Sequence, residues 1–302
     1  MNRPGTIAVS TPAAVHRVVG RRGGVARRAY TLVELLVAIT IMLVLVGIVA
    51  AGAASARTSS KRQATQLLIG KLNTIIQQQF ATYASRGAPA SILTGSNKSA
   101  ARGAYLRQMV TGDIPDSWGE VRYMVSNTSQ FTSSPQRAYI GMWNARSAAG
   151  KTPSDSYGDA ECLFMAVMQG GIANCLDCGE LKTAEKGDVD NDGAFEFLDA
   201  WGNPIRYVLW PGQLELPAGS GALFFSTDAP FAPNAAGRTM RPLIFSGGPD
   251  QLNSVAVNGG SNLSLGTQCG IPSASAYGGR DTSSSGDYRA DNITNFDAEV
   301  SR

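Results

Sequence analysis

The sequence predicts an α+β protein in which one long N-terminal helix lays part of its length on an antiparallel β-sheet head. Three observations lead to this fold class. The 20 residues from Leu35 to Ala54 carry no charge. From Leu68 to Tyr83 apolar residues recur every three or four positions among Gln, Lys and Thr. After residue 87, short strand-like runs alternate with loops rich in Gly, Ser and Asn.

The charge is unevenly distributed along the chain. Of the 26 basic residues, six are arginines within residues 1–29, a stretch without any acid. The remainder holds 20 basic and 23 acidic residues, a net charge of −3. We therefore expect no nucleic-acid binding through a general positive field. The hydrophobic content of 43% supports a packed core, and the low charged fraction of 16% is typical of an extracytoplasmic protein.

The uncharged stretch Leu35–Ala54 is long enough to cross a membrane. At 1.5 Å per residue it spans about 30 Å as a helix. The arginines before it predict a cytoplasmic N-terminus and a body outside the cytoplasm, although Arg57, Lys61 and Arg62 weaken this asymmetry. The stretch is longer than the apolar core of an ordinary signal peptide, but the small residues up to Ala56 leave cleavage there as an alternative.

Glu34 lies at the start of this apolar stretch, where a carboxylate is costly and therefore a functional candidate. The residues Ala29-Tyr30-Thr31-Leu32-Val33-Glu34 resemble the processing signal of type IV pilins and type II secretion pseudopilins. The resemblance implies that a prepilin peptidase cuts between Ala29 and Tyr30 and methylates Tyr30. It also implies that Glu34 pairs with the N-terminus of a neighbouring subunit. Ala29 in place of the usual Gly and the long leader depart from the pattern, and an uncleaved anchor is the alternative.

The predicted organisation has four parts. They are a basic leader (1–29), the transmembrane part of the helix (30–56), its amphipathic part (57–86) and an extracytoplasmic globular head (87–302). The amphipathic part should pack on the sheet, and Gly87-Ala88-Pro89 should end the helix. Within the head, strand-like runs are expected at Val121–Val125 and Tyr139–Trp143.

Three later segments extend the resemblance. Asp199–Leu209 predicts a turn followed by a strand, because Gly202 and Pro204 precede an aromatic and aliphatic run. This segment is similar to the Asp-x-Trp-Gly-x-Pro segment of the major pseudopilin of type II secretion. Arg241–Asp250 resembles that family's later strand and turn, and Asp291–Phe296 resembles its C-terminal ending. The resemblance implies the pilin-like version of the α+β fold.

A calcium site is expected in the acidic loop, Asp188–Asp199. Carboxylates occupy its first, third, fifth, ninth and twelfth positions and Gly193 its sixth; they are Asp188, Asp190, Asp192, Glu196 and Asp199. This is the ligand spacing of a calcium loop, in which Gly makes the sharp turn. A solvated acidic turn is the alternative. The resemblance separately implies a calcium site near the C-terminus, at Asp250 and Asp291.

The four cysteines are an even number in a body expected to lie in an oxidising compartment. They are Cys162, Cys175, Cys178 and Cys269. Two disulfides are the leading interpretation, with the connectivity open. A zinc site or redox pair at Cys175-Leu176-Asp177-Cys178 is the alternative, but no second CxxC and no nearby His supports it.

These features predict a structural subunit and no enzyme. The only histidine, His16, lies in the leader, and the sequence shows no Gly-x-Ser-x-Gly elbow and no phosphate loop. The resemblance implies a single-pass inner-membrane protein that assembles with other pilin or pseudopilin subunits. The filament would be a type II secretion pseudopilus or a type IV pilus. The alternative is a membrane-anchored calcium-binding domain that does not assemble.

Overall fold

The structure is a computed structural model, and it describes residues 31–94, 96, 98–169, 183–211, 213–215, 222–224, 241–252, 255, 257 and 291–296. The chain divides into two compact units, Met1–Ala53 and Ala54–Arg302, and each is treated by itself below. The predictions for Ala29, Tyr30, Cys175, Cys178 and Cys269 lie outside the described residues.

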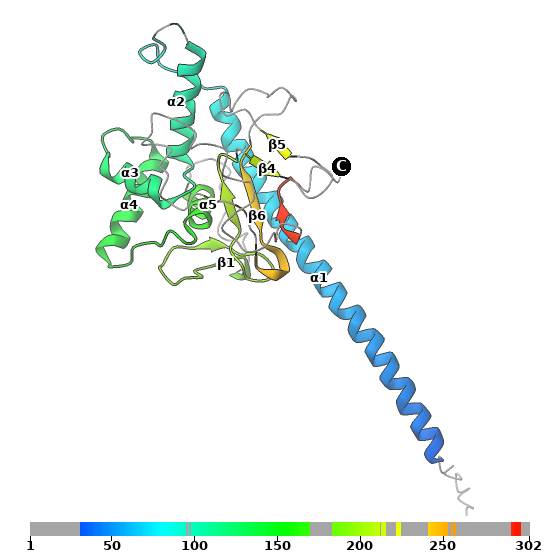
Figure 1. Cartoon of the computed structure of the whole chain (residues 1–302). Coiled ribbons are helices and arrows are strands. Elements are labelled where there is room, and N and C mark those ends of the chain that lie inside the picture. Colours follow the sequence, from blue (N-terminus) through cyan, green and yellow to red (C-terminus); the bar gives the residue numbers. More distant parts are fainter. Residues whose placement is uncertain are drawn as a thin grey trace, which may run out of the picture. The chain divides into compact units, whose positions relative to one another are not determined.

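The predicted long N-terminal helix is confirmed as α1, Leu32–Ala84, a helix of 53 residues (Figure 1). Thr31 and Glu34 form a reciprocal cap at its start. The Thr31 amide donates to Glu34 Oε2 over 2.9 Å, and the Glu34 amide donates to Thr31 Oγ1 over 3.2 Å. This capping box satisfies donors that the first helical turn leaves without a partner. The helix ends three residues before Gly87, close to the predicted breaker.

The central sheet of the head is antiparallel, as predicted. It has the order β3-β6-β7, built from Arg206–Val208, Leu243–Ser246 and Ile293–Thr294. Tyr207 pairs with Ile244, and Ser246 pairs with Ile293. The three segments that carry the family resemblance therefore supply one strand each to a single sheet. The first of them begins with the expected turn, in which Gly202 adopts φ +89°.

The second half of α1 (Ala54–Ala84) shares a core with this sheet. Its stripe is buried from Leu68 to Tyr83, and Leu72 and Ile76 are fully inaccessible. The stripe joins side chains of all three strands in one apolar cluster, including Tyr207, Phe245 and Ile293. Burial of this stripe explains why the amphipathic periodicity follows the helix beyond the apolar stretch.

Four helices precede the sheet in the chain, and they gather on one side of the strands (Figure 1). They are α2 (Lys98–Asp113), α3 (Trp118–Ser126), α4 (Ser134–Ala148) and α5 (Gly158–Gln169). The strands expected at Val121–Val125 and Tyr139–Trp143 are therefore wrong, because these runs belong to α3 and α4. Short apolar runs do not distinguish the two periods, and the capping box at Ser133 decides for helix in α4.

These helices enclose a second apolar cluster, which includes Trp118, Tyr139, Trp143 and Cys162. Ala194, from the acidic loop, is buried in the same cluster. The remaining elements are short, namely η1 (Thr183–Glu185), β1 (Lys186–Gly187), β2 (Glu196–Phe197), β4 (Gln213–Glu215), β5 (Ala222–Phe224) and η2 (Gly248–Asp250). β1 pairs with β2, and β4 pairs with β5, both antiparallel.

Candidate functional site

The first half of α1 (Leu32–Ala53) is apolar and exposed. Its large hydrophobic side chains range from 47% exposed at Val37 to 80% at Leu32. This is the one helix in the described part of the chain that is long and apolar enough to cross a membrane. An apolar surface of this extent needs lipid or other helices around it, because water would solvate it at high cost. The described residues therefore fit a single-pass membrane anchor.

Glu34 stands in the first turn of this helix, on an exposed surface. Thr31 holds one of its carboxylate oxygens, Oε2, through the Thr31 amide and hydroxyl at 2.9 and 3.1 Å. A negative charge at this position is favoured by the helix dipole. The capping box orients the Glu34 carboxylate toward the end of α1 at which Tyr30 precedes the described residues.

The first part of the acidic loop is the turn between β1 and β2, and the loop continues through β2 to Asp199. Asn191 and Gly193 both adopt left-handed backbone conformations, with φ +61° and +91°. The Gly193 amide donates to Asp188 Oδ2 over 2.9 Å, and the Ala194 amide donates to Asp192 Oδ1 over 2.8 Å. The residue Gly193 is required here because a side chain would be strained at this φ. The loop thus folds tightly around its own carboxylates.

The loop's carboxylates converge in two overlapping groups. Oxygen atoms of Asp188, Asp190 and Glu196 all lie within 4.8 Å of one another. Oxygen atoms of Asp190, Asp192 and Glu161 do the same, so Asp190 belongs to both groups. The structure therefore brings together four of the five loop residues named from the sequence and adds a fifth carboxylate, that of Glu161.

Glu161 was missed by sequence reasoning because it lies on α5, 27 positions before the loop, with no spacing signal that connects the two. Its residue is 1% exposed, and its Oε2 accepts a short hydrogen bond from the Trp118 indole. The pKa of Glu161 is raised to about 9, chiefly by burial and also by the charges of Asp192, Asp190 and Glu196, against the lowering effect of the Trp118 hydrogen bond. A buried carboxyl beside other carboxylates resists ionisation.

The pKa of Glu196 is raised by the same kinds of cause. Burial raises the pKa of its carboxyl to about 7, with Asp190, Asp188 and Asp192 adding to the effect and the hydrogen bond from the Val189 amide opposing it. Burial places these carboxylates where water cannot stabilise their charge. A positive charge between them would counteract both the burial and the repulsion that raise the two pKa values.

Asp199, the expected twelfth ligand, does not join either group. Its Oδ1 accepts from the Trp201 and Asn203 amides at 2.8 and 2.9 Å, and its Oδ2 accepts from Ser246 Oγ at 2.7 Å. The carboxylate thereby stabilises the turn at residues 199–203, called the Trp-Gly turn below, and connects it to β6. Asp199 has the spacing of a twelfth ligand, but both of its carboxylate oxygens accept hydrogen bonds within and beside the turn.

The residues of the expected C-terminal site, Asp250 and Asp291, are near enough to interact electrostatically, and Gly248 approaches the Asp291 backbone closely. Gly248 has φ +70°, and a Cβ there would lie 2.6 Å from the Asp291 carbonyl oxygen. Partial burial raises the pKa of the Asp291 carboxyl, and so does the negative charge of Asp250. Among the residues that the structure describes, no third carboxylate, His or Cys converges with this pair. Calcium at this position stays a prediction.

Cys162 is a free thiol in the structure and is fully buried in the second apolar cluster. Burial raises the pKa of this thiol, and the surrounding carboxylates add to the shift. A buried thiol that stays protonated is unreactive. The disulfide prediction stays untested, because the other three cysteines lie outside the described residues.

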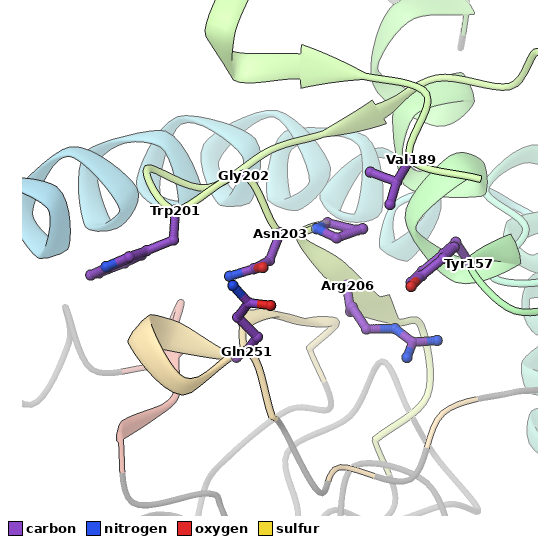
Figure 2. A pocket seen from close by; sticks show the side chains of 9 residues that line it. Tyr157, Val189, Trp201, Gly202, Asn203, Arg206 and Gln251 are labelled. Atoms are coloured by element: carbon purple, nitrogen blue, oxygen red, sulfur yellow. The ribbon is translucent and has the colours of Figure 1, made fainter. Parts of the chain in front are cut away.

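A pocket of about 420 Å³ opens beside the Trp-Gly turn. Figure 2 shows Trp201 at one end of it and Tyr157 and Arg206 at the other. The guanidinium of Arg206 is neutralised by the buried Asp159 carboxylate, with Nη2 and Oδ1 2.6 Å apart. Among the residues that the structure describes, the lining of this pocket contains no carboxylate, histidine or cysteine.

Comparison with known protein families finds a match at the N-terminal end of the chain. The prokaryotic N-terminal methylation motif matches residues 25–50, which contain the end of the leader and the start of α1. This motif is the prepilin-type signal of type IV pilins and pseudopilins. The chain therefore carries a prepilin-type signal, and this motif implies processing by a prepilin peptidase and points to a structural rather than enzymatic role. No curated protein and no solved structure matches the chain.

Proposed function

We propose that the chain is a structural subunit of a type II secretion pseudopilus or type IV pilus-like filament, assembled through its N-terminal helix. The observation that carries this proposal is a prepilin-type signal that opens directly into a helix with apolar side chains exposed around it. Cleavage between Ala29 and Tyr30 would leave that helix at the new N-terminus. Subunits would then stack head to tail, a contact that propagates without closing.

The charges near the cut support this assembly. Cleavage creates an ammonium at Tyr30, four positions before Glu34. Between lipid-embedded helices, a carboxylate and an ammonium are far more stable together than apart, so pairing between neighbours sets the axial register of one subunit on the next. Before assembly, the membrane holds the subunit with its N-terminus in the cytoplasm and its head outside, in agreement with the arginines of the leader.

The test is the N-terminal residue and mass of the protein taken from its native membrane, beside two variants of Glu34. The expected product begins at a methylated Tyr30. Glu34→Ala removes both the charge and the helix cap, whereas Glu34→Gln keeps an oxygen for the Thr31 donors and removes only the charge. Both variants should be processed and both should fail to form filaments that can be sheared from cells.

Assembly by Glu34→Gln but not by Glu34→Ala would assign Glu34 to the helix cap alone and contradict the pairing with Tyr30. An intact Met1, or a cut near Ala56, would overturn the filament proposal. Either result would leave the anchored or secreted calcium-binding domain as the function.

A further inference from the structure

The strongest unexplained feature of the head is a set of buried carboxylate oxygens without hydrogen-bond donors. In the described part of the chain, Glu161 Oε1, Glu196 Oε1 and Asp188 Oδ1 are buried and accept no hydrogen bond. Glu161 is 1% exposed and Glu196 is fully inaccessible. Buried acceptors left without a partner each cost free energy, so an arrangement of three in one place calls for a ligand.

These oxygens belong to residues of the two converging carboxylate groups. Each of the three residues supplies a ligand atom to one of the two groups that meet at Asp190. Two oxygens on opposite sides of a bound Ca²⁺ are about 4.8 Å apart, because each lies about 2.4 Å from the ion. The spread of ligand oxygens within each group therefore fits the coordination sphere of a Ca²⁺ ion, and Asp190 is common to both groups.

The neighbouring hydrogen bonds fix other oxygens of the set and do not reach the three unpartnered oxygens named above. Ser154, in the loop before α5, donates its hydroxyl to Asp190 Oδ2 over 2.5 Å and its amide to Asp192 Oδ2 over 2.7 Å. Arg146 approaches only one member, with Nη1 4.0 Å from Asp192 Oδ1. One guanidinium at that distance does not balance five carboxylates.

We propose that Asp188, Asp190, Asp192, Glu196 and Glu161 bind a single Ca²⁺ ion that joins the acidic loop to α5. An all-oxygen, carboxylate-rich set with more than four ligands favours Ca²⁺ over Zn²⁺, which selects tetrahedral nitrogen and sulfur ligands. The twelfth loop position, Asp199, is replaced in this site by Glu161 from a separate helix. The site does not depend on the filament role of the chain.

The consequence is mechanical. Glu161 lies on α5, which packs in the second apolar cluster, whereas Asp188 and Glu196 belong to the hairpin that leads into the Trp-Gly turn. An ion held by both therefore fastens the helices α3–α5 to the hairpin. Because the ion binds the folded head and not the unfolded chain, it should stabilise the fold by mass action.

The proposal is tested on the full chain in detergent, stripped with a chelator and titrated with Ca²⁺ by calorimetry. One Ca²⁺ should bind per chain and raise the melting temperature, and Mg²⁺ at the same concentration should do so far less. Asp190→Asn, which affects both groups, and Glu161→Gln should each weaken Ca²⁺ binding about tenfold or more. Asp155→Asn is the matched control, because Asp155 is an exposed partner of Arg122 and should leave the affinity unchanged.

Luminescence of bound Tb³⁺ reports the position of the ion, a readout separate from the Ca²⁺ affinity. Trp118 donates its indole N–H to Glu161, so Tb³⁺ in the site should show strong tryptophan-sensitised emission that Ca²⁺ displaces. The melting temperature of each variant in chelator is also measured. A variant that is unfolded without the ion loses binding through misfolding and not through loss of a ligand. The proposal is overturned if wild-type chain binds no Ca²⁺. It is also overturned if Glu161→Gln binds Ca²⁺ as tightly as wild type, or if Asp291→Asn abolishes binding while Asp190→Asn does not.

Discussion

The two halves of α1 are one continuous helix exposed to two different environments. In the first half, large apolar side chains are exposed around the helix, as at Leu43 and Val44. In the second half, a single apolar stripe is buried against the sheet while Leu67, off the stripe, stays 70% exposed. The difference shows that the solvent around a helix, rather than its propensity, sets the pattern of its sequence.

The largest effect is expected from truncating the buried stripe. Leu72→Ala should lower the free energy of unfolding of the head by about 2–5 kcal/mol, because Leu72 is inaccessible and a cavity would remain. Denaturant unfolding of the full chain in detergent measures this. Leu67→Ala on the same helix should change the value by less than about 0.5 kcal/mol. Equal losses in the two variants would show that the stripe is not the packed face.

An introduced arginine should affect membrane insertion in the first half of α1 and not in the second half. Val44→Arg should reduce membrane insertion by about 2.5–3.5 kcal/mol, because arginine is poorly tolerated at the centre of a bilayer. Leu67→Arg, at an exposed position outside the apolar stretch, should leave insertion unchanged. The fraction of chain that resists alkaline carbonate extraction reports the difference. Insertion of Val44→Arg at the wild-type level would argue that the first half of α1 is not the membrane segment.

The smallest effect separates the threonines of the two halves. In the second half, the buried Thr65 Oγ1 accepts from the Ala200 amide over 3.1 Å, a contact that ties α1 to the Trp-Gly turn. Thr65→Val should cost about 1 kcal/mol, because it leaves that amide without an acceptor.

Thr40, in the first half, donates only to the Val37 carbonyl of its own helix, at 2.8 Å. Thr40→Val should therefore leave the unfolding of the head unchanged. A loss in Thr40→Val as large as that in Thr65→Val would contradict the assignment of the two halves to separate environments.

The sequence predicted α1 and the strand β3, because each depends on a local signal, and the family resemblance implied the later strand, β6. Hydrophobic period identified the helix, and Gly and Pro before an apolar run identified β3. The helices α3 and α4 were missed because their apolar runs are short, and short runs satisfy both periods. Their identity depends on burial of residues such as Trp118 and Tyr139 in a cluster that local pattern does not reveal.

In the candidate calcium site too, some residues follow from a local signal and others depend on the tertiary structure. Asp188, Asp190, Asp192 and Glu196 follow a fixed spacing around Gly193, and the spacing was enough to name them. Asp199 also fits that spacing, but the turn that follows it needs both carboxylate oxygens for its own amides and for Ser246.

By itself, the sequence determined the apolar segment, the prepilin-type signal, the helix and the acidic loop, because these depend on residues close together in the chain. The tertiary structure alone decided that Glu161 faces that loop and that Asp199 does not. It also decided that three distant segments form one sheet on the second half of α1. Such contacts depend on how helices and strands pack, and packing joins residues whose separation in the sequence carries no period and no spacing.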